Sequence, residues 1–153
     1  MTATYTATLP PLPSHEGRAV ALDDILAARD ARAERQQTMQ AACGVLFSLT
    51  LAAPGAVKRS PLLDAVFQAA QQAVENTIPT PQAVNIHIDD CGHHALYRVD
   101  GDAYEWKHAM LALEAASPLA RLWDIDIIAA NGRPISRAAC DLPPRRCLLC
   151  DDD

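Results

Sequence analysis

Apolar residues recur along this chain with two periods, and the order of these periods predicts an α+β fold. Spacings of three and four residues predict helices over 22–42, 62–76 and 103–116. Alternating or continuous apolar runs predict strands over 45–52, 83–88, 94–99 and within 120–128. A last short strand is expected at 134–137, after the Asn131-Gly132 turn.

After the first helix, the elements follow one another as strand, helix, strand, strand, helix, strand. This order is the ferredoxin-like split β-α-β pattern, here with an additional N-terminal helix. Right-handed crossovers then give an antiparallel sheet with the strands in the order 4-1-3-2. Residues 1–18 are expected to form a flexible or extended leader, and residues 19–153 a single domain with a Pro/Arg/Cys tail.

The fourth strand begins with two carboxylates two residues apart, in Trp123-Asp124-Ile125-Asp126. Alternate residues of a strand face the same side, so Asp124 and Asp126 project together. Neighbouring carboxylates raise each other's pKa unless a cation lies between them. Magnesium (Mg²⁺), held by one or two carboxylates and by substrate phosphates, would supply that charge. The alternative is an ordinary strand with two aspartates facing water.

The predicted sheet order brings a cationic loop to this pair. It places the end of the first strand beside the start of the fourth, so we expect the loop 54–58 to lie next to Asp124 and Asp126. A helix starts directly after the loop, at Ser60-Pro61. Lys58 and the free N–H groups of that helix favour a phosphate site. The P-loop motif is absent, so an ordinary strand-to-helix loop is an equal alternative.

The charge of the chain limits its partners. The formal net charge of -6 argues against nucleic-acid binding by a basic surface. The 13 basic residues nevertheless gather in groups. Such groups suit a small, highly phosphorylated ligand, although a solvated face is the commoner role of clustered charge. The groups are Arg29, Arg32 and Arg35; Lys58 and Arg59; and Arg133, Arg137, Arg145 and Arg146.

The sequence indicates neither a membrane span nor an export signal. No apolar run approaches the ~20 residues that span a bilayer. The five cysteines are an odd number, so we expect reduced thiols and a cytoplasmic protein. Histidines of the predicted hairpin, His87, His93 and His94, are not expected to bind metal. Cys147 and Cys150 could supply half of a zinc site, but structural zinc needs four ligands and no second half is evident.

Three parts of the chain together resemble a known family. They are Leu26-Ala27-Ala28-Arg29-Asp30-Ala31-Arg32, Pro54-Gly55-Ala56-Val57-Lys58, and Pro118-Leu119-Ala120-Arg121-Leu122-Trp123-Asp124-Ile125-Asp126 with the later Ser136-Arg137 and Pro143-Pro144-Arg145-Arg146-Cys147-Leu148-Leu149-Cys150. From about Leu22 to Cys150, the chain resembles the citrate lyase holo-acyl-carrier-protein synthase family, also called apo-citrate lyase phosphoribosyl-dephospho-CoA transferase.

The resemblance implies an enzyme of the nucleotidyltransferase type. Its members transfer a phosphoribosyl-dephospho-CoA group from triphosphoribosyl-dephospho-CoA to a serine of the citrate lyase acyl carrier subunit, and pyrophosphate leaves. The resemblance implies that Asp124 and Asp126 hold magnesium, and one of them could instead accept the serine proton. The implied phosphate ligands are Arg29, Arg32 and Lys58, with Arg121, Arg137, Arg145 and Arg146 as further candidates.

The chain departs from the family pattern near the carboxylate pair. Ala120 stands where the family usually has glycine, and Ser117 where it often has histidine. If that glycine gives room for a phosphate, the methyl group of Ala120 would occupy the room. The family also continues with further cysteine and histidine residues after Cys150, where this sequence has three aspartates. These departures leave an alternative function, a non-catalytic carrier-binding or assembly protein of the citrate lyase system.

Overall fold

The computed structural model describes residues 11–40 and 44–147 and confirms the predicted α+β fold. Its strands are β1 (Val45–Leu51), β2 (Ala83–Asp89), β3 (Gly92–Val99) and β4 (Trp123–Ile128). Its helices are α1 (Leu22–Gln40), α2 (Pro61–Thr77) and α3 (Ala103–Ala115), with the 3-10 turns η1 (Leu119–Leu122) and η2 (Ala138–Cys140). Within these ranges, no helix is both long and apolar enough to cross a membrane.

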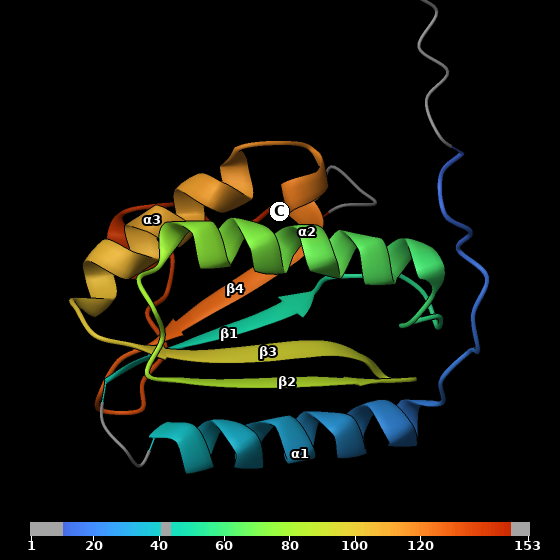
Figure 1. Ribbon diagram of the computed structural model, residues 1–153, viewed down its shortest axis with the longest axis horizontal. Helices are drawn as coiled ribbons and strands as arrows, with labels where there is room; N and C mark the ends of the chain where they lie inside the picture. Colours follow the sequence, from blue (N-terminus) through green and yellow to red (C-terminus); the bar gives the residue numbers. More distant parts are fainter. Residues whose placement is uncertain (1–10, 41–43, 148–153) are drawn as a thin grey trace, which may run out of the picture.

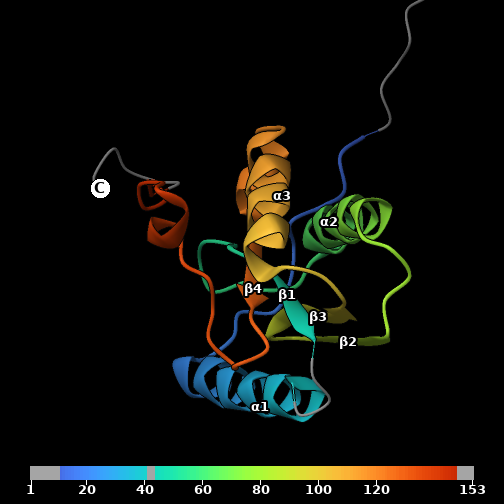
Figure 2. The same ribbon diagram turned by 90° about the vertical axis from the view of Figure 1, so that its left-hand side faces the viewer.

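The four strands form one antiparallel sheet in the order β2-β3-β1-β4. This is the predicted order, counted from the other edge. Leu51 pairs with Trp123, so the end of β1 and the start of β4 lie side by side, as predicted. The helices α2 and α3 cover one face of the sheet, and α1 covers the other (Figure 1 and Figure 2).

The main hydrophobic core lies between the sheet and the helices α2 and α3. Strand alternation turns Phe47, Leu49 and Ile125 toward these helices, and all three are at most 1% exposed. The helices contribute Phe67 from α2 and Met110 from α3, which are equally buried. Because this core is apolar throughout, the polar residues of β4 must face the opposite side of the sheet.

The helix α1 packs on a more polar face and buries none of its residues completely. The Gln36 amide donates a hydrogen bond of 2.8 Å to the Ser48 hydroxyl, and Met39 packs against a small apolar cluster of the sheet. The leucines that begin the helix remain open to solvent, since Leu22 is 69% exposed and Leu26 is 46% exposed. Polar contacts therefore contribute to holding α1 on the sheet.

An extended segment before α1 pairs with the loop between β1 and α2. The Val20 N–H donates to the Ala56 carbonyl at 3.0 Å. A side chain at Gly17 would collide with the Arg59 carbonyl, so this close approach requires glycine. The pairing fixes the path of the loop across the end of the sheet.

Two predicted boundaries differ in the structure. The strand predicted at 134–137 is only a single bridge between Pro134 and Ile128. Proline has no N–H to continue a ladder, and the chain turns into η2 directly after Arg137. The first helix is described up to Gln40, and the remainder of its predicted range lies outside the described residues.

Candidate active site

Asp124 and Asp126 lie on the same face of β4, as the strand alternation predicts. In the pairing of β4 with β1 they stand opposite Thr50 and Ser48. The Thr50 hydroxyl donates to Asp124 Oδ2 at 3.4 Å. Because α1 packs mainly against β1 and β3, it leaves Asp124 half-buried and Asp126 exposed. The two carboxylates therefore form an accessible acidic pair at the edge of the sheet.

The two carboxylates affect each other electrostatically. Partial desolvation, and then the charge of Asp124, raise the pKa of Asp126. The cationic side chains of Lys107, Arg32 and Arg145 act in the opposite direction but do not overcome this rise. Cations from three parts of the chain thus approach the pair, and the pair still favours a further positive charge.

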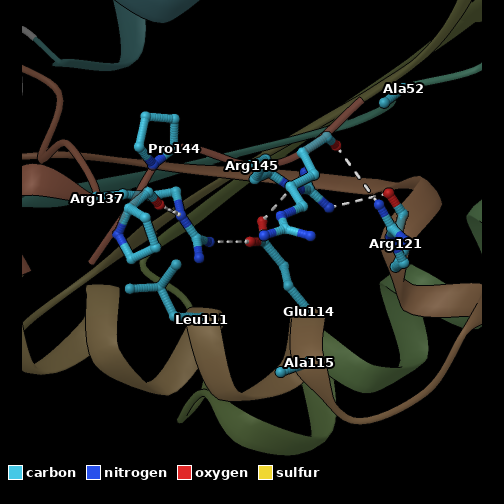
Figure 3. A pocket seen from close by; sticks show the side chains of 10 residues that line it. Ala52, Leu111, Glu114, Ala115, Arg121, Arg137, Pro144 and Arg145 are labelled. Carbon is cyan, nitrogen blue, oxygen red and sulfur yellow. Dashed lines mark hydrogen bonds and ion pairs between the residues drawn. The ribbon is translucent and has the colours of Figure 1, made fainter. Parts of the chain in front are cut away.

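A cavity of about 820 Å³ lies next to the start of β4, between α3, η1 and the C-terminal segment (Figure 3). This volume is typical of sites for cofactors and other sizeable ligands. Four arginines and one carboxylate supply the charged part of its wall. They are Arg121, Arg137, Arg145, Arg146 and Glu114. Guanidinium groups bind phosphate oxygens in pairs, so the wall suits a ligand that carries phosphates.

Arg145 connects this cavity with the carboxylate pair. Its guanidinium donates to the backbone carbonyls of Trp123 and Arg121 at 2.9 Å each. Its Nη1 lies 3.7 Å from Asp124 Oδ1 and 4.0 Å from Glu114 Oε1. Arg145 lines the cavity and also contacts Asp124, so a ligand that binds Arg145 in the cavity lies close to Asp124.

Glu114 and Lys107 are buried charged residues of α3 that the sequence analysis did not single out. They are 8% and 5% exposed, respectively. The Ile125 N–H donates to Glu114 Oε1 at 3.0 Å, and Lys107 Nζ donates to the Ile125 carbonyl at 3.4 Å. These bonds replace a neighbouring strand on the outer edge of β4. Since Ile125 separates Asp124 from Asp126, they fix the backbone between the two carboxylates.

Glu114 also faces the arginines of the cavity (Figure 3). Its Oε2 lies 3.8 Å from Arg137 Nη1. Burial raises the pKa of the Glu114 carboxyl, although nearby cations lower it. The sequence does hold a signal for this residue. Lys107 and Glu114 stand at the two ends of a stripe whose middle positions are the buried Met110 and Leu111.

The position of Lys58 beside Asp124 and Asp126 stays a prediction. The Lys58 ammonium group donates to the Ala53 carbonyl at 2.6 Å, and its backbone lies next to Gly92 in the turn between β2 and β3. The loop that carries Lys58 pairs with the segment before α1 through the bridge between Ala19 and Val57.

The two predicted arginines of α1 differ in their surroundings. Arg32 is half-buried and acts electrostatically on Asp126, so it approaches the carboxylate pair from the side of α1. Arg29 lies one turn earlier, at an exposed position. The structure thus gathers the C-terminal arginines at the cavity, adds Arg32 from the opposite side, and leaves Arg29 and Lys58 outside the cavity wall.

The carboxylate pair fits magnesium better than it fits a structural metal. In the described part of the chain, no three His, Cys, Asp or Glu side chains gather in a metal-binding arrangement. Magnesium needs only one or two protein carboxylates, because water and substrate phosphates complete its coordination. Two aspartates on the same face of the strand, next to an arginine-lined cavity, meet this requirement.

The other metal candidates form no metal-binding group within the described residues. The hairpin histidines have separate partners: His87 with Asp89, His93 with Asp64, and His94 with Ser48. Cys147 is an exposed residue of the C-terminal segment. Cys150 lies outside the described residues, so the structure does not describe the cysteine pair.

Comparison with known proteins identifies the family. Residues 20–153 match the model of the family described as apo-citrate lyase phosphoribosyl-dephospho-CoA transferase, or CitX. The chain belongs to the CitX family. The resemblance seen in the sequence is thereby confirmed. The arginine-lined cavity and the carboxylate pair described above lie within the matched residues.

Named relatives cover nearly the whole chain. An apo-citrate lyase phosphoribosyl-dephospho-CoA transferase of Shigella flexneri is 36% identical over 149 residues, which are 94% of this chain and 80% of that protein. A probable transferase of the same name from Escherichia coli is 35% identical with the same coverage. Protein CitXG of Haemophilus influenzae is 38% identical, but the chain spans only 31% of its length.

The structure locates Ala120, which we expect to depart from the family pattern. Ala120 lies in η1, is 0% exposed and belongs to the hydrophobic core. It is not among the residues that line the cavity. Its methyl group therefore takes no room from the cavity, and the main departure from the family pattern does not narrow the candidate site.

Proposed function

We propose that this CitX protein attaches the phosphoribosyl-dephospho-CoA group to the acyl carrier subunit of citrate lyase. The reaction is of the nucleotidyltransferase type: a carrier serine displaces pyrophosphate from triphosphoribosyl-dephospho-CoA. The observation that carries this proposal is the contact of Arg145 with Asp124, which joins a cavity lined by arginines to a carboxylate pair. The relatives' names support the same activity.

In the proposed reaction, the serine oxygen attacks the phosphorus next to the ribose. The new bond joins that oxygen to phosphorus, and the bond from phosphorus to the pyrophosphate oxygen breaks. The serine proton leaves, either to a carboxylate of the pair or to solvent. The cavity arginines bind the phosphates and orient them, and Arg145 holds the reacting end near Asp124.

Asp124 and Asp126 are the residues that would hold magnesium. The bound ion would neutralise charge on the triphosphate and on the departing pyrophosphate. Either aspartate alone could instead serve as the proton acceptor. Arg29 and Lys58 stay predictions as phosphate ligands. We expect the reaction to take place in the reducing cytoplasm, because Cys91 and Cys140 are free thiols.

The test measures pyrophosphate release from the triphosphate precursor in the presence of the apo carrier subunit and magnesium. Asp124→Asn and Asp126→Asn should each lower the rate by roughly 100- to 1000-fold, since each weakens a contribution of several kcal/mol to the transition state. Asp90→Asn is the matched control, because Asp90 is an exposed carboxylate paired with Arg18. Near-normal rates in both test variants would remove the carboxylate pair from the mechanism.

A further inference from the structure

A second, smaller cleft of about 50 Å³ lies between α1 and the hairpin of β2 and β3. Its wall includes Arg32, Arg35, His87, Asp89 and His94. It shares no lining residue with the large cavity. Its volume has room for one small group, since a water molecule takes up about 30 Å³ of the liquid.

Three buried nitrogen atoms of this wall lack a hydrogen-bond partner among the described residues. They are Arg35 Nε, His93 Nδ1 and His94 Nδ1. His94 is only 3% exposed, so solvent does not reach most of its ring. Buried polar atoms are nearly always paired in proteins, and an orphaned one calls for a water or an ion.

Hydrogen bonding at Ser48 favours a donor role for His94 Nδ1. The Gln36 amide donates to Ser48 Oγ at 2.8 Å, and His94 Nε2 lies 3.1 Å from the same oxygen. The Ser48 hydroxyl can donate one proton, and His94 Nε2 is the acceptor beside it. If Nε2 accepts that proton, the neutral imidazole carries its own proton on Nδ1. The cleft then presents two unpaired N–H donors, from Arg35 and His94.

The charge of the cleft is positive. Burial, and then the charges of Arg32 and Arg35, lower the pKa of His94 to about 3, so the imidazole is neutral at pH 7. Asp89 is the one carboxylate of the wall. Desolvation alone would raise its pKa, but the hydrogen bonds from His87 and from the Cys91 N–H lower it, so Asp89 is ionised. Two guanidinium groups against one carboxylate leave a net charge of one.

We propose that this cleft is a binding site for one phosphate group, held by Arg32, Arg35 and the Nδ1–H of His94. An anion with several acceptor oxygens satisfies the donors of Arg35 and His94 and the surplus positive charge together. Phosphate has that chemistry, and arginine is its preferred partner in proteins.

The position of the cleft relates it to the carboxylate pair. Asp126 stands opposite Ser48 in the sheet, and Ser48 contacts His94. The two sites therefore share one face of the sheet and are separated by two strand spacings, roughly 10 Å. Resting on the proposed function, we infer that the cleft receives a phosphate of the pyrophosphate product as it leaves Asp124 and Asp126.

The test measures phosphate and pyrophosphate binding to the full chain by calorimetry at constant ionic strength. Arg35→Gln should weaken both ligands at least tenfold. Arg133→Gln is the control, because Arg133 is exposed and lies outside the walls of both cavities, and the affinity of this variant for both ligands should stay within twofold of the wild type. Asp89→Asn should tighten binding severalfold, because it removes the opposing charge. The ¹⁵N signal of His94 Nδ1 should shift as phosphate is added.

Each other outcome overturns the inference. Equal losses of affinity in Arg35→Gln and Arg133→Gln would indicate general charge attraction. Unchanged affinity in Arg35→Gln and Asp89→Asn, with an unmoved His94 signal, would mean that the cleft holds water alone. Pyrophosphate that binds only through Arg121 would assign the anion to the large cavity. The binding assay needs no carrier and no turnover, so a failure of the proposed transfer reaction would leave its result intact.

Discussion

Glu114 is the residue on which the two halves of the proposed site depend. Its carboxylate accepts the Ile125 N–H at 3.0 Å, between the two aspartates, and faces Arg137 and Arg145 at 3.8 and 4.0 Å. The variant Glu114→Ala removes all of these contacts at once. Glu114→Gln keeps the side-chain volume and an acceptor oxygen for Ile125, but it removes the charge.

The expected loss of stability follows from burial. In Glu114→Ala, the Ile125 N–H loses its partner, which costs about 1–3 kcal/mol. Lys107, which is only 5% exposed, also loses its nearby carboxylate. Removing one partner of a buried pair costs about 3–5 kcal/mol, and because the two effects overlap, we expect a total of about 3–5 kcal/mol. Glu114→Gln should cost less, about 1–2 kcal/mol.

Urea unfolding followed by tryptophan fluorescence measures these free energies. Glu105→Gln is the matched control, because Glu105 occupies an exposed position on the same helix, and its stability should change by less than about 0.5 kcal/mol. In the transfer assay, Glu114→Gln should lose about tenfold in activity, because the uncharged side chain no longer positions Arg137 and Arg145 by charge. If the Glu114→Ala protein is as stable as the control, Glu114 does not stabilise the backbone of β4 at Ile125.

Two further predictions concern stability. The pKa of His94 is lowered to about 3 in the folded protein, from about 6.5 in the unfolded chain. Between these two pH values, only the unfolded chain binds a proton at His94. The free energy of unfolding therefore decreases as the pH falls from 6.5 toward 3. From pH 7 to pH 5, the wild type should lose about 2 kcal/mol more than His94→Gln in phosphate-free urea titrations, and equal losses would contradict the buried neutral state. Ser60 caps α2 by accepting the Leu63 N–H at 3.2 Å, so Ser60→Ala should cost about 1 kcal/mol and lower Tm by about 3 °C. Thr80→Ala, at an exposed position, serves as the control, and an equal Tm for both variants would refute the capping role.

Local patterns were sufficient to predict most of the fold. The alternation of apolar residues fixed which face of β4 enters the core, and so it predicted that Asp124 and Asp126 project together. The order of elements and the right-handed crossover rule predicted the sheet order and the pairing of Leu51 with Trp123. These features depend on short-range spacing and on general topology, which a single sequence contains.

Features that depend on distant contacts were not predictable in the same way. The direction of Lys58 depends on the pairing of its loop with a segment about 40 residues earlier, seen in the bridge between Ala19 and Val57. Lys107 and Glu114 carry charges at positions that face the core. Their role depends on the tertiary structure, which places them beside the open edge of β4. There, Lys107 donates to the Ile125 carbonyl and Glu114 accepts the Ile125 N–H.

The intact mass of the apo carrier subunit tests the central claim most directly. The carrier is incubated with this protein, magnesium and triphosphoribosyl-dephospho-CoA, and released pyrophosphate is measured in the same sample. The account predicts that the carrier gains the mass of one phosphoribosyl-dephospho-CoA group and that one pyrophosphate appears for each modified carrier. An unchanged carrier mass, in a preparation that the Escherichia coli relative does modify, would contradict it.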